Sequence, residues 1–145
     1  MGVQWPYLLN FLIYLSVSLP LLILGMVMFL FTTPYKEFQL IREGADTEDV
    51  QKRDAAKAAV LDLGGKTLGL SLVIASAIYH TMHVMDLIIW GIVASVFQVL
   101  IFYLLELLTP FRMVSEIPKG NVPVGMFTCF LSVATGLMIA ALISY

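Results

Sequence analysis

Four polar side chains in otherwise apolar stretches are the residues best suited to carry chemistry: Asp62, Lys66, Gln98 and Glu106. Asp62 and Lys66 are four residues apart, so on a helix they share a face and can form an ion pair. A charge or amide in such surroundings needs a partner, which is either a neighbouring helix or an ion or solute that crosses a membrane. We favour helix contact for these residues, and a polar path for solutes is the alternative.

A second group, His80, His83 and Asp86, is spaced by three residues. Imidazole binds transition metals and titrates near neutral pH, so His80 and His83 are weak candidates for a metal site or an external pH sensor. The surrounding sequence offers no further ligand, and we expect neither a metal nor another cofactor. The sequence GGKT at residues 64–67 ends like a Walker A motif, but Val60 occupies the place of its first glycine. Because the sequence contains no recognisable set of catalytic residues, we expect no enzyme activity.

Helices in a membrane must position these side chains. Of the 145 residues, 60% are hydrophobic and 12% are charged, whereas an average soluble domain is about half apolar and about a quarter charged. Four segments have the roughly 20 mostly apolar residues that a membrane-spanning helix needs. They are Tyr7–Phe31, Ala58–Tyr79, Leu87–Leu108 and Val122–Ser144. The expected fold is therefore all-α and integral to the lipid bilayer, with residues 1–145 forming a single four-span domain.

The basic residues predict an orientation. All eight Lys and Arg residues lie in or just after two polar segments, residues 32–57 and 109–121. The positive-inside rule then predicts that both segments face the cytoplasm and that both termini lie outside it. The net charge of −2 gives no basic field for nucleic acid, so no nucleic-acid partner is expected.

The two polar segments also match each other. Residues 33–44 read TPYKEFQLIREG and residues 109–120 read TPFRMVSEIPKG. In each, threonine predicts a helix N-cap, proline the first helical position and the final glycine a C-cap. Apolar residues then recur every third position, which predicts a short amphipathic helix on the cytoplasmic membrane surface after each Thr-Pro. The motif residues are Thr33, Pro34, Gly44, Thr109, Pro110, Gly120 and Asn121.

The spans that follow these segments align as well, with Gly65 matching Ser132 and Gly69 matching Gly136. The chain therefore reads as two parallel two-helix repeats, at about residues 7–80 and 86–145, related by a two-fold axis along the membrane normal. Small residues let helix backbones approach each other, so the aligned stripes predict packing faces, with a water-filled path as the alternative. The packing residues are Gly65, Gly69, Gly125, Ser132 and Gly136.

Several motifs carry a resemblance to a known family. They are the Thr-Pro-aromatic segment that continues through Glu37 to LIREG, the glycines of residues 64–69, DLIIWG from Asp86, Gln98, and GNVPVGMF from Gly120. In order and spacing they resemble the YjfL-like bacterial inner-membrane family, domain of unknown function 350. The resemblance covers nearly the whole chain and implies a multi-pass protein of the bacterial inner (plasma) membrane. It implies no activity and no catalytic residues.

Two functions remain open from the sequence. The leading hypothesis is a non-enzymatic membrane module that self-associates, or docks a membrane-protein partner, through its small-residue faces and Thr-Pro segments. The alternative is a small ion or solute channel or transporter that uses the polar residues of the second and third spans.

Overall fold

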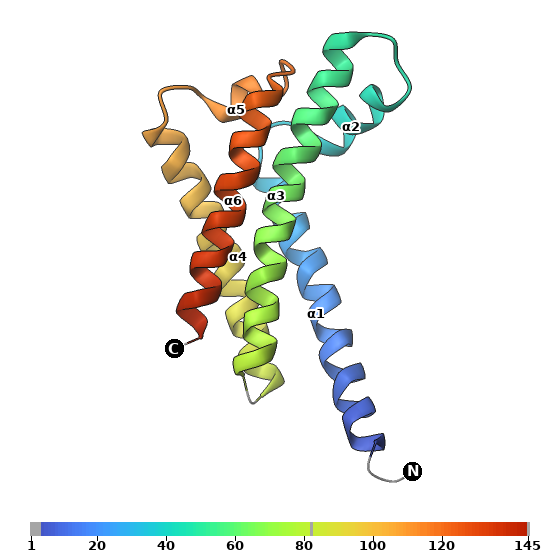
Figure 1. Ribbon diagram of the computed structural model, residues 1–145, viewed down its shortest axis with the longest axis vertical. Coiled ribbons are helices and arrows are strands. Elements are labelled where there is room, and N and C mark those ends of the chain that lie inside the picture. Colours follow the sequence, from blue (N-terminus) through green and yellow to red (C-terminus); the bar gives the residue numbers. More distant parts are fainter. Residues whose placement is uncertain (1–3, 82, 145) are drawn as a thin grey trace.

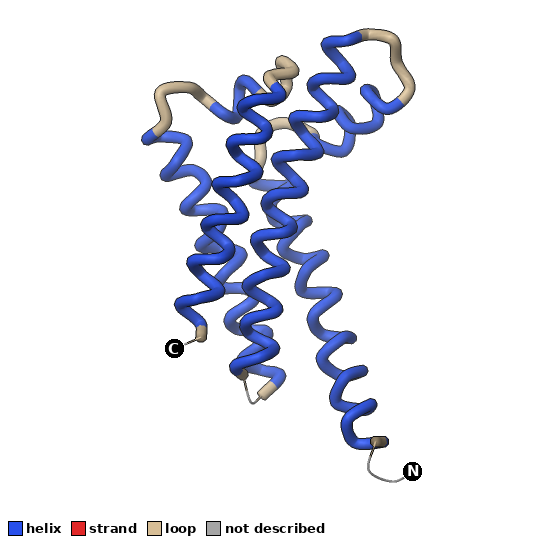
Figure 2. The backbone as a smooth tube through the Cα atoms, in the orientation of Figure 1, coloured by secondary structure: helices blue, strands red, loops and turns tan. Residues whose placement is uncertain are grey.

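The computed structural model describes residues 4–81 and 83–144, and this part of the chain is helical without strands (Figure 2). Its helices are α1 (Trp5–Thr32), α2 (Glu37–Ala45), α3 (Val50–His80), α4 (Val84–Leu108), α5 (Met113–Glu116) and α6 (Val122–Ile143). Helices α1, α3, α4 and α6 are long and apolar enough to cross a membrane. The predicted all-α fold with four spans is therefore confirmed at this level.

The four long helices run side by side, and α3 lies in the middle (Figure 1). The short helices α2 and α5 both lie at one end of the bundle, which we call the loop end, and the chain termini lie at the other. The most extensive contact joins α3 to α6, and α3 also packs against α1, α2 and α4. Helix α1 contacts the bundle through the half that buries Leu21, Gly25 and Phe29 and diverges from it toward the N-terminus.

Close backbone approach explains the α3–α6 contact. A Cβ atom on Gly136 would overlap the backbone of Gly69, and one on Gly125 would lie 2.7 Å from the Cα of Ala58. A Cβ on Gly65 would lie 2.5 Å from the Cα of Cys129. The two small-residue stripes therefore face each other inside one chain.

Helix α3 begins at Val50, eight residues before the predicted membrane span at Ala58, so residues 50–57 of the predicted polar segment are helical. Asp49 caps it, because the side-chain oxygen accepts hydrogen bonds from the backbone N–H groups of Gln51 (3.0 Å) and Lys52 (3.4 Å). Hydropathy detects only the apolar part of a helix, whereas the first two turns of α3 are charged and extend beyond that part.

The Thr-Pro pairs end spans and do not begin loop helices. Thr33 and Thr109 each keep a last helical hydrogen bond through the backbone N–H and then adopt extended backbone, with ψ of 130° and 144°. A proline disfavours the helical conformation in the residue before it, so each pair terminates its span. The loop helices begin only at Glu37 and Met113. The predicted helix-start roles are therefore wrong for Thr33, Pro34, Thr109 and Pro110.

Gly44 also has a different role from the predicted C-cap, because α2 continues to Ala45 and is capped by Asp46. A Cβ on Gly44 would lie 2.5 Å from the carbonyl oxygen of Lys52 and would overlap Ala56. Glycine at this position therefore lets α2 lie directly on the first turns of α3.

Gly120 and Asn121 connect α5 to α6. Gly120 has a φ of 87°, a left-handed conformation that glycine adopts without a steric penalty. Helix α5 ends at Glu116, four residues before this glycine, so Gly120 shapes the turn and does not cap the helix. Asn121 caps α6 by accepting a hydrogen bond from the backbone N–H of Val124 (3.4 Å).

Candidate functional site

A group of polar side chains lies buried between α3, α4 and the chain segment that joins α1 to α2. We call it the polar cluster and define it as Thr33, Tyr35, Glu37, Asp62, Lys66 and Gln98. Each of these residues is at most 8% exposed, and Glu37 and Asp62 are fully buried. The cluster joins Asp62, Lys66 and Gln98, which the sequence singled out, to residues of the first Thr-Pro segment.

An ion pair forms the centre of the polar cluster. Lys66 Nζ lies 2.6 Å from Asp62 Oδ2, and both side chains are almost completely buried. The same ammonium donates a long hydrogen bond to Thr33 Oγ1 (3.4 Å) and lies 4.1 Å from the centre of the Phe102 ring. A carboxylate, a hydroxyl and an aromatic face thus stabilise the charge of Lys66 in place of water.

Tyr35 attaches the connecting segment to this pair. Its phenol donates a 2.5 Å hydrogen bond to Asp62 Oδ2, the same oxygen that accepts from Lys66. Burial and the charge of Asp62 raise the pKa of Tyr35 far above its ordinary value of 10.0, so Tyr35 stays a neutral donor. Asp62 Oδ1, in contrast, accepts no hydrogen bond from any described residue.

Glu37 adds a second carboxyl group to the polar cluster, whose one basic residue is Lys66. Neither Oε1 nor Oε2 of Glu37 has a hydrogen-bond partner in the described part of the chain. Burial raises the pKa of Glu37 above the ordinary 4.5, and the nearby backbone N–H of Glu37, the positive charge of Lys66 and the Thr33 hydroxyl oppose that rise. Two carboxyl groups therefore lie near one ammonium in a site shielded from water, but only Asp62 pairs with it. A proton on Glu37 removes the charge that has no counter-ion.

Gln98 marks the depth of the polar cluster. Its side-chain amide donates to the backbone oxygens of Lys66 (3.1 Å) and Ser132 (3.4 Å), and so links α4 to α3 and α6. Gln98 lies ten residues before the end of α4 at Leu108, which is about 15 Å along the helix. Because a bilayer's hydrocarbon core is about 30 Å thick, the polar cluster extends toward the middle of the span.

Glu106 lies beside the polar cluster rather than in it. Its carboxylate oxygens accept weak hydrogen bonds from the backbone N–H of Val114 (3.3 and 3.4 Å), which ties α4 to the segment around α5. Nearby, the phenol of Tyr103 donates to the backbone oxygen of Thr32, where α1 ends. Both contacts connect the loop end to the spans.

Within the described residues, His80 and His83 do not lie close to enough other ligands to form a metal site. His80 Nδ1 lies 2.9 Å from the backbone oxygen of Ser76, and His83 precedes α4 as its N-cap. Across residues 4–81 and 83–144, no group of three or more His, Cys, Asp or Glu side chains could hold a metal ion.

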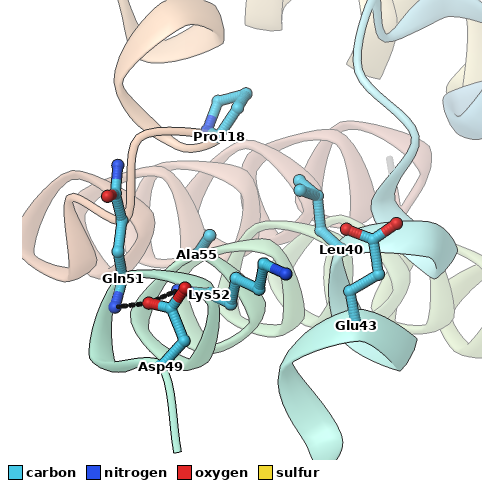
Figure 3. A pocket seen from close by; sticks show the side chains of 7 residues that line it. All are labelled: Leu40, Glu43, Asp49, Gln51, Lys52, Ala55 and Pro118. Carbon is cyan, nitrogen blue, oxygen red and sulfur yellow. Dashed lines mark hydrogen bonds between the residues drawn. The ribbon is translucent and has the colours of Figure 1, made fainter. Parts of the chain in front are cut away.

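A separate cavity of about 280 Å³ opens at the loop end between α2, α3 and Pro118 (Figure 3). Figure 3 shows Glu43 on one side and Asp49 with Lys52 on the other, so the lining carries charges of both signs. The side chain of Asp49 already occupies the backbone N–H groups at the start of α3. This cavity therefore offers no free anion site at that helix end.

The sequence did not single out Tyr35 and Glu37 as site residues. Their region read as an amphipathic surface helix with an apolar face at Tyr35, Phe38 and Ile41, but Phe38 is 55% exposed while the charged Glu37 is buried. The burial of Glu37 is not part of the predicted pattern, and the amphipathic surface helix stays a prediction for α2. One difference between the two segments could have indicated these residues. Tyr35 and Glu37 in the first segment align with the apolar Phe111 and Met113 in the second.

Replacing Glu37 by glutamine is expected to raise the stability of the folded protein at neutral pH. The folded protein holds the Glu37 proton more tightly than the unfolded chain does, so wild-type stability falls as the pH rises above 4.5 toward the raised pKa. Glutamine does not titrate, and the Glu37→Gln variant should lose less stability over that range. Thermal unfolding in mild detergent at a series of pH values measures the difference. Equal pH dependence in both proteins would contradict the assignment.

The comparisons with known proteins agree with this architecture. The profile of a family described as Domain of Unknown Function (DUF350) matches residues 4–143. UPF0719 transmembrane protein YshE of Bacillus subtilis (strain 168) is 30% identical over 129 residues, which are 88% of each chain. UPF0719 inner membrane protein YjfL of Escherichia coli (strain K12) is 28% identical over 138 residues, 95% of this chain and 96% of that protein. No solved structure matches the chain. The resemblance expected from the motifs is therefore confirmed.

Proposed function

This chain belongs to the DUF350 family of multi-spanning inner-membrane proteins, and on that premise we propose that it is a small, non-enzymatic transporter that carries protons through its polar cluster. The observation that carries the proposal is the composition of that cluster. Two buried carboxyl groups, Glu37 and Asp62, lie near the single ammonium of Lys66, which pairs with Asp62, and three of their four oxygens accept no hydrogen bond within the described residues.

The proton is the cation that suits these groups. A metal ion would need six or more oxygen ligands for Ca²⁺, or an octahedral set for Mg²⁺. The cluster offers two carboxyl groups and the amide oxygen of Gln98, and Lys66 already places a positive charge beside Asp62. Gain or loss of one proton, in contrast, changes the net charge of the cluster without adding a ligand. Ionisable groups within membrane spans commonly mark proton or ion paths.

A comparison of the two proposed repeats supports a functional origin of the charges. In the alignment of the repeats, Asp62 and Lys66 match Cys129 and Val133. Phe111 and Met113, which match Tyr35 and Glu37, pack in an apolar cluster in which Met113 is fully buried. The second half thus builds the equivalent place without charges. The fold does not require the charges, and we infer that activity does.

The contacts between small residues of α3 and α6 support the proposed two-helix repeat. Gly125 lies against Ala58 and Gly136 lies against Gly69, and both pairs are separated by the same number of residues as the aligned spans. Equivalent positions that meet near a common axis are what a two-fold relation between α3 and α6 produces. The positive-inside rule places the loop end in the cytoplasm and both termini outside.

The segment that joins α1 to α2, residues 33–36, acts as the gate in this proposal. Thr33 and Tyr35 hold it on Lys66 and Asp62, and α2 covers the cluster from the loop end. Two cavities border Lys66 or Gln98, each of about 10 Å³, which is about the volume needed for one water molecule. The arrangement is therefore closed, and displacement of the segment would open the cluster to the cytoplasm.

Proton flux into vesicles tests the proposal. The purified protein is reconstituted with a pH-sensitive dye inside the vesicles, and a potassium diffusion potential drives protons inward. Wild-type protein should change the internal pH faster than empty vesicles, and the Asp62→Asn variant should reduce the rate to that of empty vesicles. A Glu116→Gln/Lys119→Gln variant, which removes a partly exposed ion pair of 2.8 Å at the loop end, serves as control and should keep its flux. Flux that Asp62→Asn leaves unchanged would contradict the proposal.

Self-association is a second candidate function, as the sequence suggested, but through a different surface. The small-residue faces and the Thr-Pro segments are occupied within the chain. One other apolar surface is the outer half of α1, where Leu8 and Leu12 are 46% and 48% exposed and the helix diverges from the bundle. A second copy of this chain would cover that half.

Cysteine crosslinking tests this candidate. In a Cys129→Ser background, oxidation should crosslink a Leu12→Cys variant into dimers in the membrane. A Leu107→Cys variant, which is also exposed but lies at the end of α4, is the control and should remain monomeric. A monomer by native mass spectrometry, with no crosslink at Leu12, would exclude this mode of association.

A further inference from the structure

A long groove follows one face of α3 outside the polar cluster. Two surface cavities, of about 470 and 480 Å³, share Ile41 and Val60 and are therefore continuous. One begins beside Arg53 and Lys57 at the loop end, and the other continues past Gly64 to Ser71. We call this continuous surface the α3 groove.

We propose that the α3 groove binds an anionic phospholipid, with the phosphate of the headgroup at Arg53 and Lys57 and one acyl chain along Gly64. The proposal does not depend on the function of the polar cluster. It rests on the length of the groove, the chemistry of its lining and the position of its charges.

The length of the groove fits one leaflet of a bilayer. The α3 residues that line it recur every three or four positions and so share one face of the helix. From Val60 to Ser71 the apolar part covers eleven residue steps, which is about 16 Å at the rise of an α-helix. Half of a hydrocarbon core of about 30 Å is nearly the same length.

The lining of the α3 groove between Val60 and Ser71 suits an acyl chain. Its hydroxyl groups are not free to bind a polar ligand, because Thr67 donates to the backbone oxygen of Leu63 (2.8 Å) and Ser71 donates to that of Leu68 (2.7 Å). The other residues that line this part, Leu22 and Met26 of α1 among them, are mostly apolar. The groove therefore presents a surface that an acyl chain can cover.

Gly64 differs from the other glycines that the structure describes. A Cβ on Gly64 would have no atom of a described residue within 4 Å, whereas Gly65 and Gly69 are held against neighbouring groups. Glycine destabilises the interior of a helix relative to alanine, and packing within the described part of the chain does not explain it here. A missing side chain at this position deepens the groove for an occupant.

The charges at the loop end select the headgroup. Arg53 is exposed and forms no ion pair with the described residues, and Lys57, 56% exposed at its side chain, pairs at the surface with Asp54 (2.9 Å). Both basic residues line the groove and Asp54 does not. The apolar lining ends at Val60. Arg53 and Lys57 lie one to two helical turns closer to the loop end, which is the level of the lipid phosphates. An anionic lipid should therefore bind in preference to a zwitterionic one.

Thermal unfolding of the full chain in mild detergent tests the site, with dioleoyl phosphatidylglycerol or dioleoyl phosphatidylcholine added. The wild-type midpoint should rise more with phosphatidylglycerol. An Arg53→Gln/Lys57→Gln variant should bind it roughly 30-fold more weakly, since each basic residue near a lipid surface contributes about 1 kcal/mol. An Arg112→Gln/Lys119→Gln variant removes the same charge from the other loop and should behave as wild type. A Gly64→Leu variant should fold but lose the lipid-dependent rise.

Three results would overturn the proposal. Equal stabilisation by both lipids would show that the headgroup charge is not recognised. Loss of the preference in the Arg112→Gln/Lys119→Gln variant, but not in the groove variant, would place the lipid elsewhere. Dissociation of an oligomer by Gly64→Leu in lipid-free detergent would show that a second copy of the chain occupies the groove.

Discussion

Replacing Lys66 by methionine is expected to destabilise the protein by about 3–5 kcal/mol, because it leaves a buried carboxylate without its counter-ion. Asp62 would keep only the hydrogen bond from Tyr35, with the second carboxyl group of Glu37 in the same cluster. The free energy of unfolding in a denaturing-detergent titration, or the midpoint of thermal unfolding, measures the loss.

The Asp62→Leu/Lys66→Met double variant separates the pair from its members. Replacing a whole buried ion pair by apolar groups of similar volume is often neutral or stabilising. The double variant should therefore regain most of the stability that Lys66→Met loses. Losses that simply add in the double variant would show that the two groups do not interact, and that result would contradict the observed ion pair.

Replacing Gly136 by leucine is the second change with a large expected effect. Overpacking usually costs about 1–3 kcal/mol, because neighbouring side chains can shift. At Gly136 the neighbour is the backbone of Gly69, which can move only if α3 and α6 separate. We therefore expect a loss of about 3 kcal/mol or more. Gly64→Leu, an equal change at a glycine of α3 with open space beside it, is the matched control.

Thermal unfolding in the same detergent compares the two glycine variants. Gly136→Leu should lower the midpoint strongly or prevent purification of folded protein, whereas Gly64→Leu should stay close to wild type. Equal midpoints for both variants would show that α3 and α6 are not in backbone contact at Gly136.

The sequence predicted the spans well because hydropathy is a local property that needs no knowledge of partners. It failed at the start of α3, where Asp49 and the charged turns that follow it form a helix that hydropathy does not detect. It failed again at Thr33 and Thr109, because a Thr-Pro pair can begin one helix or end another. Only the surrounding chain decides between the two.

The polar cluster was only half visible in the sequence. Asp62 and Lys66 are one helical turn apart, so their pairing follows from spacing alone. Tyr35 lies 27 residues from Asp62, and its contact depends on how the connecting segment folds back. Burial of Glu37 beside an exposed Phe38 contradicts the local pattern, so local pattern could not predict it.

The small-residue stripes illustrate a different limit. Their spacing predicts close approach between backbones, but it does not say whether the partner helix belongs to the same chain. In the structure Gly69 and Gly136 meet each other, so these stripes are used within the bundle. Association with a second copy would need another surface, such as the outer half of α1, which diverges from the bundle.

Proton flux through the Asp62→Leu/Lys66→Met variant tests the proton-carrying role of the polar cluster most directly, because this variant is expected to fold without the charges. In vesicles driven by a potassium diffusion potential, the wild-type protein should conduct protons and the folded double variant should not exceed empty vesicles. Proton flux at the wild-type rate in the double variant would contradict the role of Asp62 and Lys66 in transport.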